Sequence, residues 1–244
     1  MKIALIGYGN MGQEIEKLVR EDGKHEIVSV SFDGENGLDK KGIERADVAI
    51  DFTSPEIVMD TIQTVAKLRT PLVIGTTGWY EQLDQVKKIV EKNNIGLMYG
   101  GNFSVGANLF FKIVSCASQL INHYEQYDVY GYEIHHRGKK DSPSGTARKL
   151  TEIMLQNISS KKVLQTNRLD RQIKNDELHF ASLRGGTNPG KHTVIFDSLA
   201  DEITLTHQAH GRRGFAEGAL LAAAFIKDRK GMYHFDKLFD EGVK

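Results

Sequence analysis

Three things are scarce in this chain of 244 residues: cysteine, long apolar runs and an excess of charge of either sign. The single cysteine, Cys116, excludes an intrachain disulfide and a cysteine-rich metal site, and it is typical of a reducing compartment. The longest apolar run, residues 219–226, is far shorter than the ~20 residues that cross a bilayer, and the N-terminal apolar stretch is too short for a signal peptide. Basic and acidic residues balance at 32 each, which argues against a nucleic-acid-binding or polybasic membrane protein. The sequence predicts a soluble, cytoplasmic, globular protein.

Short apolar runs alternate with helical patterns over the first 100 residues. Continuous apolar strands between helices are typical of a parallel sheet that is covered on both faces, so we expect an α/β, Rossmann-like, doubly wound domain. Ser54 is the predicted N-cap of one helix, with Pro55 as its first residue. Strands are predicted at residues 3–6, 27–32, 48–52, 72–74 and 95–98, and helices at residues 11–20, 55–66 and 83–90.

The pattern changes after Asn102. A long amphipathic helix over residues 105–121, in which Cys116 is expected to be buried and inert, is followed by strand-like segments with few helices between them. This order predicts an α+β domain with an open, mostly antiparallel or mixed sheet. We expect a dinucleotide-binding domain of residues 1–103 and 214–244, and a substrate-binding and oligomerisation domain of residues 104–213. The predicted strands of the second domain are residues 127–134, 178–183, 192–196 and 202–210, with a helix near 146–156 and a loop at 157–177. The buried last helix, residues 215–226, belongs to the first domain.

The strongest motif is the G-x-G-x-x-G at residues 7–12, which follows a strand and opens a helix. Gly7 permits the tight turn, Gly9 lets the backbone approach a pyrophosphate, and Gly12 permits close helix–strand packing. The phosphates would lie at the positive end of the helix dipole. The motif therefore predicts a bound dinucleotide, against the alternative of a glycine-rich turn without a ligand.

Asp33 ends the second predicted strand, 21 residues after Gly12, where a ribose-binding acid is expected. A carboxylate there accepts a hydrogen bond from a free 2′-hydroxyl and repels a 2′-phosphate, so NADH should serve at least as well as NADPH. Lys40 and Lys41 would soften that preference if their loop folds back. Thr76 and Thr77, between two glycines after another strand, fit a loop that runs close to the dinucleotide, although an ordinary turn explains them equally well.

The third feature is the run from Glu133 to Thr146, in which a strand leads into His135 and His136, then basic residues, a proline turn and a Ser-Gly-Thr helix start. A helix N-terminus offers N–H groups and hydroxyls to an anion, and Lys139 with a histidine offers cations and a proton donor. A solvated basic turn is the alternative. The run lacks the spacing of a zinc motif, so we expect no metal.

Together these stretches resemble the 4-hydroxy-tetrahydrodipicolinate reductase family over nearly the whole chain. The His-His-Arg-x-Lys run followed by Pro-Ser-Gly-Thr is the specific part of the likeness. The resemblance implies hydride transfer from NADH or NADPH to a ring with two carboxylates, with loss of water, on the diaminopimelate route to lysine. It rests on the segments 7–12, 75–78, 102–106, 133–139, 143–146, 184–186 and 215–219.

The resemblance also implies roles for single residues. His135 and Lys139 take the acid positions, with Lys139 as the preferred proton donor, and family members are commonly tetramers built through the substrate-domain sheet. Asn10 stands where an arginine is often found, and Asp33 lacks an adjacent arginine, which leaves the NADPH preference open. The substrate-binding set is His136, Ser144, Gly145 and Thr146, and the cofactor-binding set is Gly7, Tyr8, Gly9, Asn10, Met11, Gly12, Asp33, Gly75, Thr76, Thr77, Gly100, Gly101, Asn102 and Phe103.

Two other functions fit parts of the sequence. One is a different nicotinamide-dependent dehydrogenase that acts on amino or keto acids. The other is a redox-sensing regulator that binds NADH without turnover, for which an acid in the cleft, such as Lys139 or His135, has no use. His123, His192 and His234 are expected to be ordinary surface or core residues.

Overall fold

The computed structural model describes residues 1–32 and 37–240. The chain divides into two compact units, the first formed by residues 1–105 together with the chain from residue 212 onward, and the second by residues 106–211. Within the described ranges, no helix combines the length and the apolar character that a membrane crossing requires.

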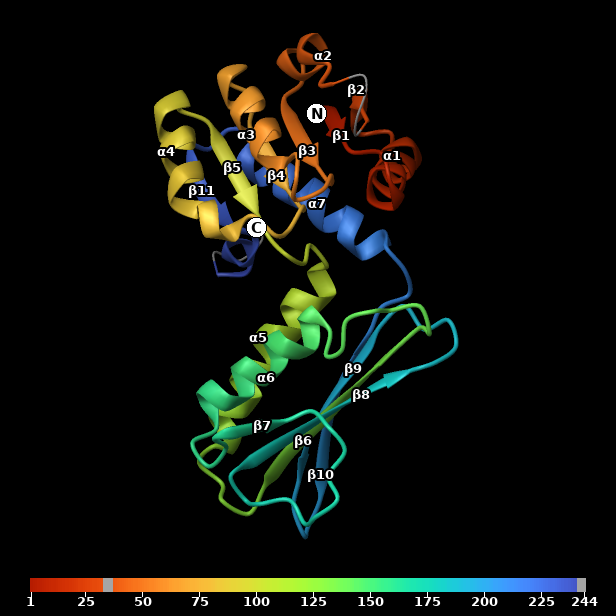
Figure 1. Ribbon diagram of the computed structural model, residues 1–244, viewed down its shortest axis with the longest axis vertical. Helices are drawn as coiled ribbons and strands as arrows, with labels where there is room; N and C mark the ends of the chain where they lie inside the picture. Colours follow the sequence, from red (N-terminus) through yellow and green to blue (C-terminus); the bar gives the residue numbers. More distant parts are fainter. Residues whose placement is uncertain (33–36, 241–244) are drawn as a thin grey trace. The chain divides into compact units, whose positions relative to one another are not determined.

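The first unit is built on a six-stranded sheet in the order β11-β5-β4-β3-β1-β2, and all its pairings are parallel (Figure 1). The chain runs outward from β1 to β2 and then returns to the other side of β1, so the strand order reverses between β1 and β3. This confirms the predicted Rossmann-like sheet. The strands are β1 (Lys2–Ile6), β2 (Glu26–Ser31), β3 (Val48–Asp51), β4 (Leu72–Ile74), β5 (Gly96–Tyr99) and β11 (Gly231–His234).

Helices cover both faces of this sheet, because its strands are apolar on both sides. Along β1, Ile3 and Leu5 belong to one core cluster with α1 and α7, whereas Ala4 and Ile6 belong to a second cluster with α3 and α4. The helices are α1 (Asn10–Asp22), α2 (Lys40–Glu44), α3 (Val58–Lys67), α4 (Leu83–Asn93) and α7 (Arg213–Ile226), with short 3-10 turns η1 (Tyr80–Gln82) and η2 (Phe235–Phe239).

The predicted start of α3 is wrong. Pro55 lies in a turn in which the Ser54 carbonyl accepts hydrogen bonds from the N–H groups of Ile57 and Val58, and the helix begins only at Val58. The Ser54 hydroxyl instead bonds the Glu56 carboxylate and lowers the pKa of that group. Ser54 and Pro55 therefore form a turn before the helix and are not its N-cap and first residue. Two elements, α2 and β11, were absent from the sequence prediction.

The second unit holds a mixed five-stranded sheet in the order β10-β9-β6-β8-β7, with β6–β8 and β8–β7 parallel and the other pairs antiparallel. Helices α5 and α6 lie on one face of this sheet (Figure 1) and share its core. The stretch 157–177, predicted as a loop, contains the short strand β7. The elements are α5 (Val105–Ile121), β6 (Asp128–His135), α6 (Gly145–Asn157), β7 (Val163–Gln165), β8 (Glu177–Arg184), β9 (Lys191–Asp197) and β10 (Glu202–Gln208).

The expectation that Cys116 is buried is also wrong. The helix α5 faces the sheet with Phe110, Val114 and Ser118, which are buried, and residue 116 lies roughly 200° around the helix from residue 114. Its thiol is therefore exposed.

Candidate active site

The carboxyl ends of the first sheet bring the predicted cofactor-binding loops to one edge. Ile6 pairs with Asp51, Asp51 with Ile74, and Ile74 with Tyr99, so these last residues of β1, β3, β4 and β5 form one row across the sheet. The loops that carry the glycine motif, Thr76 and Thr77, and residues 100–103 therefore all begin at that edge. In open parallel sheets, this edge at the reversal of strand order is where ligands bind.

The glycine motif has the shape that a dinucleotide requires. A Cβ on Gly7 would lie 2.4 Å from the Phe52 carbonyl oxygen, and one on Gly12 would lie 2.4 Å from that of Gly7, so protein packing explains both glycines. At Gly9, a Cβ would meet nothing within 4 Å. Gly9 has a φ of −76°, which any residue adopts, so neither packing nor backbone conformation explains this glycine, whereas a pyrophosphate that approaches the α1 N-terminus does.

Asp51, which the sequence analysis missed, organises the neighbouring loops. Its carboxylate is fully buried and accepts hydrogen bonds from the hydroxyls of Thr76, at 2.5 Å, and Thr53, at 3.0 and 3.1 Å. The Thr53 N–H donates to the Thr76 hydroxyl at 2.8 Å, and the Thr76 carbonyl accepts from the Trp79 indole. Thr76 is thus buried and structural, while its neighbour Thr77 is exposed at the edge.

The loop after β5 lies beside Thr77. A Cβ on Gly101 would be 3.8 Å from the Thr77 methyl group, and Gly100 and Phe103 pack against Phe235. The Asn102 side chain accepts a hydrogen bond from the Ser104 N–H, which holds the loop in a turn. The predicted cofactor residues of this unit, apart from Asp33, therefore lie along one sheet edge.

A cavity of about 250 Å³ opens at the same edge. Phe32, Leu38, Lys40, Thr53 and Thr64 are among the residues that line it. Asp33 lies outside the described residues, but its neighbour Phe32 is a wall of this cavity and packs edge-on against the ring of Tyr8. Lys40 does come to the cavity, as the sequence analysis considered.

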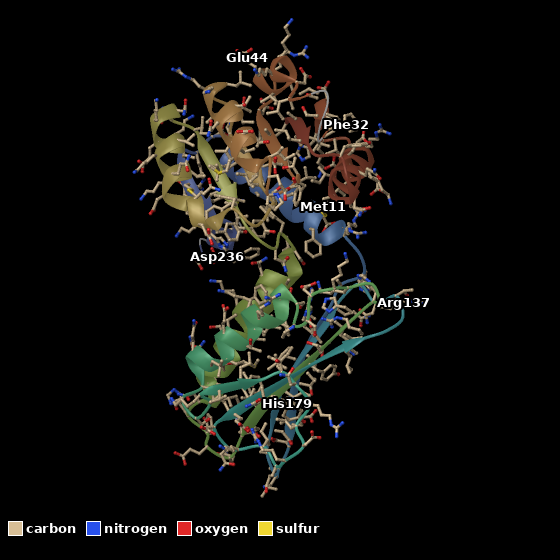
Figure 2. All side chains as sticks on the ribbon, viewed as in Figure 1. Met11, Phe32, Glu44, Arg137, His179 and Asp236 are labelled. Atoms are coloured by element: carbon tan, nitrogen blue, oxygen red, sulfur yellow. The ribbon has the colours of Figure 1, made fainter. Side chains whose placement is uncertain are left out.

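The second unit gathers polar side chains where β6 and β8 end and β9 begins. Because side chains alternate along a strand, Glu133 and His135 share the buried face of β6, while His136, just past the strand end, is exposed. In the sheet register, Glu133 pairs with Ser182 of β8 and His192 of β9. Arg137 projects outward from the loop after β6 (Figure 2).

Glu133 is the centre of this cluster. Its Oε1 accepts hydrogen bonds from the Ser144 N–H at 2.9 Å, the Ser182 hydroxyl at 2.8 Å and the Arg184 guanidinium at 2.8 Å. Its Oε2 lies 3.3 Å from His135 Nδ1 and 3.3 Å from His192 Nε2. These hydrogen bonds hold the pKa of the Glu133 carboxyl far below its usual range although burial raises it, so the group is ionised.

The two predicted acids differ in their surroundings. Burial lowers the pKa of His135 to about 4, against the opposing pull of Glu133, and His192, Lys139 and Arg184 add to the depression. The Lys139 ammonium lies 2.8 Å from an Asp141 carboxylate oxygen and is half-buried. At neutral pH, His135 is therefore uncharged.

The N-terminus of α6 completes the cluster. The Ser144 side chain is buried and caps the helix by accepting from the Ala147 N–H at 3.1 Å, and it lies 3.2 Å from His192 Nε2. A Cβ on Gly145 would meet nothing within 4 Å, so the first turn of α6 opens to space. The second unit thus brings His135 and the start of α6 to the Glu133 carboxylate, while Lys139 pairs with Asp141.

Three residues of this cluster offer side-chain atoms of the kind that bind a metal ion. Glu133, His135 and His192 are all buried, and each offers a ligand atom within 4.8 Å of the other two. The prediction that His192 is an ordinary surface or core residue did not include this cluster. The signal that would have found it is the spacing of Glu133 and His135, because two successive polar residues on the buried face of a strand require polar partners on the flanking strands.

Two family models match the chain. "Dihydrodipicolinate reductase, N-terminus" matches residues 1–103, and "Dihydrodipicolinate reductase, C-terminus" matches residues 106–239. Proteins named 4-hydroxy-tetrahydrodipicolinate reductase from Christiangramia forsetii and Staphylococcus haemolyticus are 39% and 37% identical to this chain. The first alignment covers 96% of this chain and 95% of the relative, and the second covers 98% and 100%.

Solved structures agree with these matches. The dipicolinate-bound dihydrodipicolinate reductase from Paenisporosarcina sp. TG-14 matches with a TM-score of 0.78 and 25% identity, over 98% of this chain and 99% of that one. A DAP dehydrogenase from C. glutamicum matches with a TM-score of 0.52 at 12% identity, over 100% of this chain and 99% of that one, and so shares the fold alone.

Proposed function

The chain belongs to the dihydrodipicolinate reductase family, and from this premise we propose how its residues carry out the family's reaction. The reaction reduces 4-hydroxy-tetrahydrodipicolinate to tetrahydrodipicolinate with loss of water, on the diaminopimelate route to lysine, and a reduced nicotinamide dinucleotide supplies the hydride. The observation that carries the assignment is that both family models match, one to each half of the chain.

Lys139 is the proton donor in this proposal. Hydride addition leaves negative charge on the ring, and an ammonium group beside it neutralises that charge as it gives up its proton. Lys139 holds such a proton against Asp141, whereas His135, whose pKa burial lowers to about 4, holds no second proton at neutral pH. This difference supports Lys139 over His135 as the acid.

The substrate carboxylates bind at the N-terminus of α6 and its cationic surroundings. Gly145 and Thr146 begin the helix, whose dipole favours an anion, and His136 is exposed on the loop before it. The Ser144 hydroxyl already caps Ala147, so its contribution is to hold this turn in shape. A substrate with two carboxylates explains why cations and a helix N-terminus gather in one loop.

NADH serves at least as well as NADPH in this proposal. The carboxylate of Asp33 favours a free ribose hydroxyl, while Lys40, which lines the cavity beside Phe32, offers a cation to a 2′-phosphate. Gly9 and the N-terminus of α1 would hold the pyrophosphate, and the loops that carry Thr77 and Gly101 would bind other parts of the dinucleotide.

The second sheet also supports assembly into a homotetramer. No helix of its own unit covers the face that holds Tyr130, Tyr132 and Leu183, and Leu183 is 52% exposed. Such an apolar and aromatic sheet face is typical of a contact between subunits.

A coupled assay tests the assigned function. The preceding synthase makes the substrate from pyruvate and aspartate semialdehyde, and the oxidation of NADH or NADPH is followed by absorbance. We expect oxidation that depends on the synthase, with NADH at least as effective as NADPH. Binding of NADH without any synthase-dependent oxidation would instead indicate a redox sensor, and oxidation with amino or keto acids alone would indicate another dehydrogenase.

A further inference from the structure

Glu133 is a fully buried carboxylate whose role the reaction scheme above leaves open. Its side chain has 0% exposed surface. A buried charge is costly unless partners surround it, so its retention at this place calls for a reason. Its two oxygens have distinct sets of partners.

Oε1 holds the start of the carboxylate-binding helix. It accepts the N–H of Ser144, the residue whose hydroxyl caps α6, and the guanidinium of Arg184. Arg184 in turn donates to the Asp141 carbonyl at 2.7 Å. Through these bonds, one oxygen fixes the turn before α6 and the loop that carries Lys139 and Asp141.

Oε2 faces two imidazoles. Oε2 lies 3.3 Å from His135 Nδ1 and 3.3 Å from His192 Nε2. His192 Nε2 also has the Ser144 hydroxyl at 3.2 Å, whereas His135 Nδ1 is buried and, among the described residues, makes no hydrogen bond of ordinary geometry to any other group. Buried polar atoms are almost always paired, and Oε2 is the polar atom beside His135 Nδ1, so we assign Oε2 as the partner of that nitrogen. An ionised carboxylate can only accept, so His135 donates its Nδ1–H, and the lone pair of the neutral ring then lies on Nε2.

A metal ion at the same three residues is less consistent with the surroundings. Arg184 already neutralises the Glu133 carboxylate at 2.8 Å, and Lys139 and Arg184 disfavour a further positive charge at His135. A divalent cation would face these cations without a second carboxylate to compensate it.

We propose that Glu133 is a positioning residue that holds His135 as its Nδ1–H tautomer and ties this ring to the first turn of α6. The proposal rests on the function assigned above. Its consequence is a division of labour in which His135 Nε2 accepts a hydrogen bond, Lys139 donates the proton, and the carboxylate-binding turn keeps a fixed distance from both. The same side chain would then support both substrate binding and turnover.

The test compares Glu133→Gln with Glu152→Gln, which changes an exposed glutamate on α6 of the same unit. The amide keeps the size of the side chain but loses its charge and presents N–H groups to one set of partners. We expect Glu133→Gln to lower kcat about 10- to 100-fold and to weaken binding of dipicolinate about 10-fold in calorimetry, with NADH affinity unchanged. Glu152→Gln should match the unaltered protein in all three.

A merely structural role would give a different result. If Glu133→Gln lowers the melting temperature but leaves kcat and dipicolinate affinity within twofold, the proposal is overturned. A nitrogen-15 histidine spectrum of the unaltered protein serves if the variant does not fold, because the Nδ1–H tautomer of His135 supports the proposal and the Nε2–H tautomer contradicts it. This spectrum needs no turnover, so it separates failure of the proposal from failure of the assigned reaction.

Discussion

Lys139 and Lys140 are neighbours in the chain, but only Lys139 is half-buried and paired with Asp141, while Lys140 is exposed. We expect Lys139→Ala to lower turnover by about 10²- to 10⁴-fold, the usual contribution of a general acid, and to leave NADH binding nearly intact. Steady-state kinetics and fluorescence titration with NADH measure the two effects. Lys140→Ala is the matched control and should retain near-normal turnover. Unchanged turnover in Lys139→Ala would rule out Lys139 as the donor.

The depressed pKa of His135 makes the stability of the fold depend on pH. An unfolded histidine titrates near pH 6.5, and His135 in the fold titrates at about 4, so between these values the unfolded chain binds the extra proton. This contribution is therefore fully present above pH 6.5 and is lost as the pH falls toward 4. Between pH 7 and pH 5 we expect the free energy of unfolding to fall by on the order of 2 kcal/mol through this group.

Urea unfolding at the two pH values measures this loss, and His135→Gln should reduce it. The loss should not vanish, because burial also lowers the pKa of His207. Glu133, whose pKa is depressed, adds its own loss only below the ordinary glutamate range, so it does not contribute in this window. An equal loss in His135→Gln and in the unaltered protein would show that His135 is protonated in the fold.

At Asp33 the prediction comes from the sequence alone, since this residue lies outside the described ranges. We expect Asp33→Ala to weaken the binding of NADH more than that of NADPH. The carboxylate that is lost accepts a hydrogen bond from the 2′-hydroxyl of NADH and repels the 2′-phosphate of NADPH. Dissociation constants for both dinucleotides measure the effect, with Glu26→Gln on β2 as a control. Equal losses for the two would remove the argument for a ribose contact.

At the scale of elements, the sequence predicted most of the strands and helices, but it did not predict the side-chain contacts between them. The alternation along β6 predicted a strand, but the cluster around Glu133 depends on which strands flank it, and the pairing of Glu133 with Ser182 and His192 is a matter of sheet order and register. Asp51 was missed for the same reason, because its partner Thr76 is 25 residues further along the chain. Local patterns carry no information on such distant pairs.

The segment between α6 and β8 was predicted as a loop because it is polar and charged, and its structure depends on one buried carboxylate. Glu177 binds the Arg171 guanidinium through both oxygens and accepts from the Lys174 N–H, and these bonds lower its pKa to about 2. We expect Glu177→Gln to free this segment, so that trypsin cleaves after Arg168, Arg171 or Lys174 several times faster, as measured by mass spectrometry.

The control for this loop is Glu91→Gln, which changes an exposed glutamate on α4. Activity should survive in both variants, because the loop lies at the opposite end of β8 from Arg184. Unchanged cleavage in Glu177→Gln would mean that β7, rather than the ion pair, holds the segment.

On the scale of the whole molecule, the family resemblance predicted the reaction, and the fold class is confirmed. The assembly remains a prediction that one measurement decides. We expect a mass near 109 kDa by light scattering, four times the 27.3 kDa of one chain, and a loss of mass in Tyr132→Asp, which places a charge on the uncovered sheet face. Glu202→Asp at the sheet edge is the control. A monomer mass for the unaltered protein would contradict assembly through this face.

The first unit is formed by two separate parts of the chain, and this discontinuity affects how the unit folds during synthesis. Strands β1 to β5 are translated early, yet α7, which covers Ile3 and Leu5, and β11, which pairs with β5, come only after residues 106–211 have been made. Until the continuous second unit has been synthesised, α1 covers that apolar face of the nascent sheet only in part. A chaperone that shields that face would have its greatest effect during this interval.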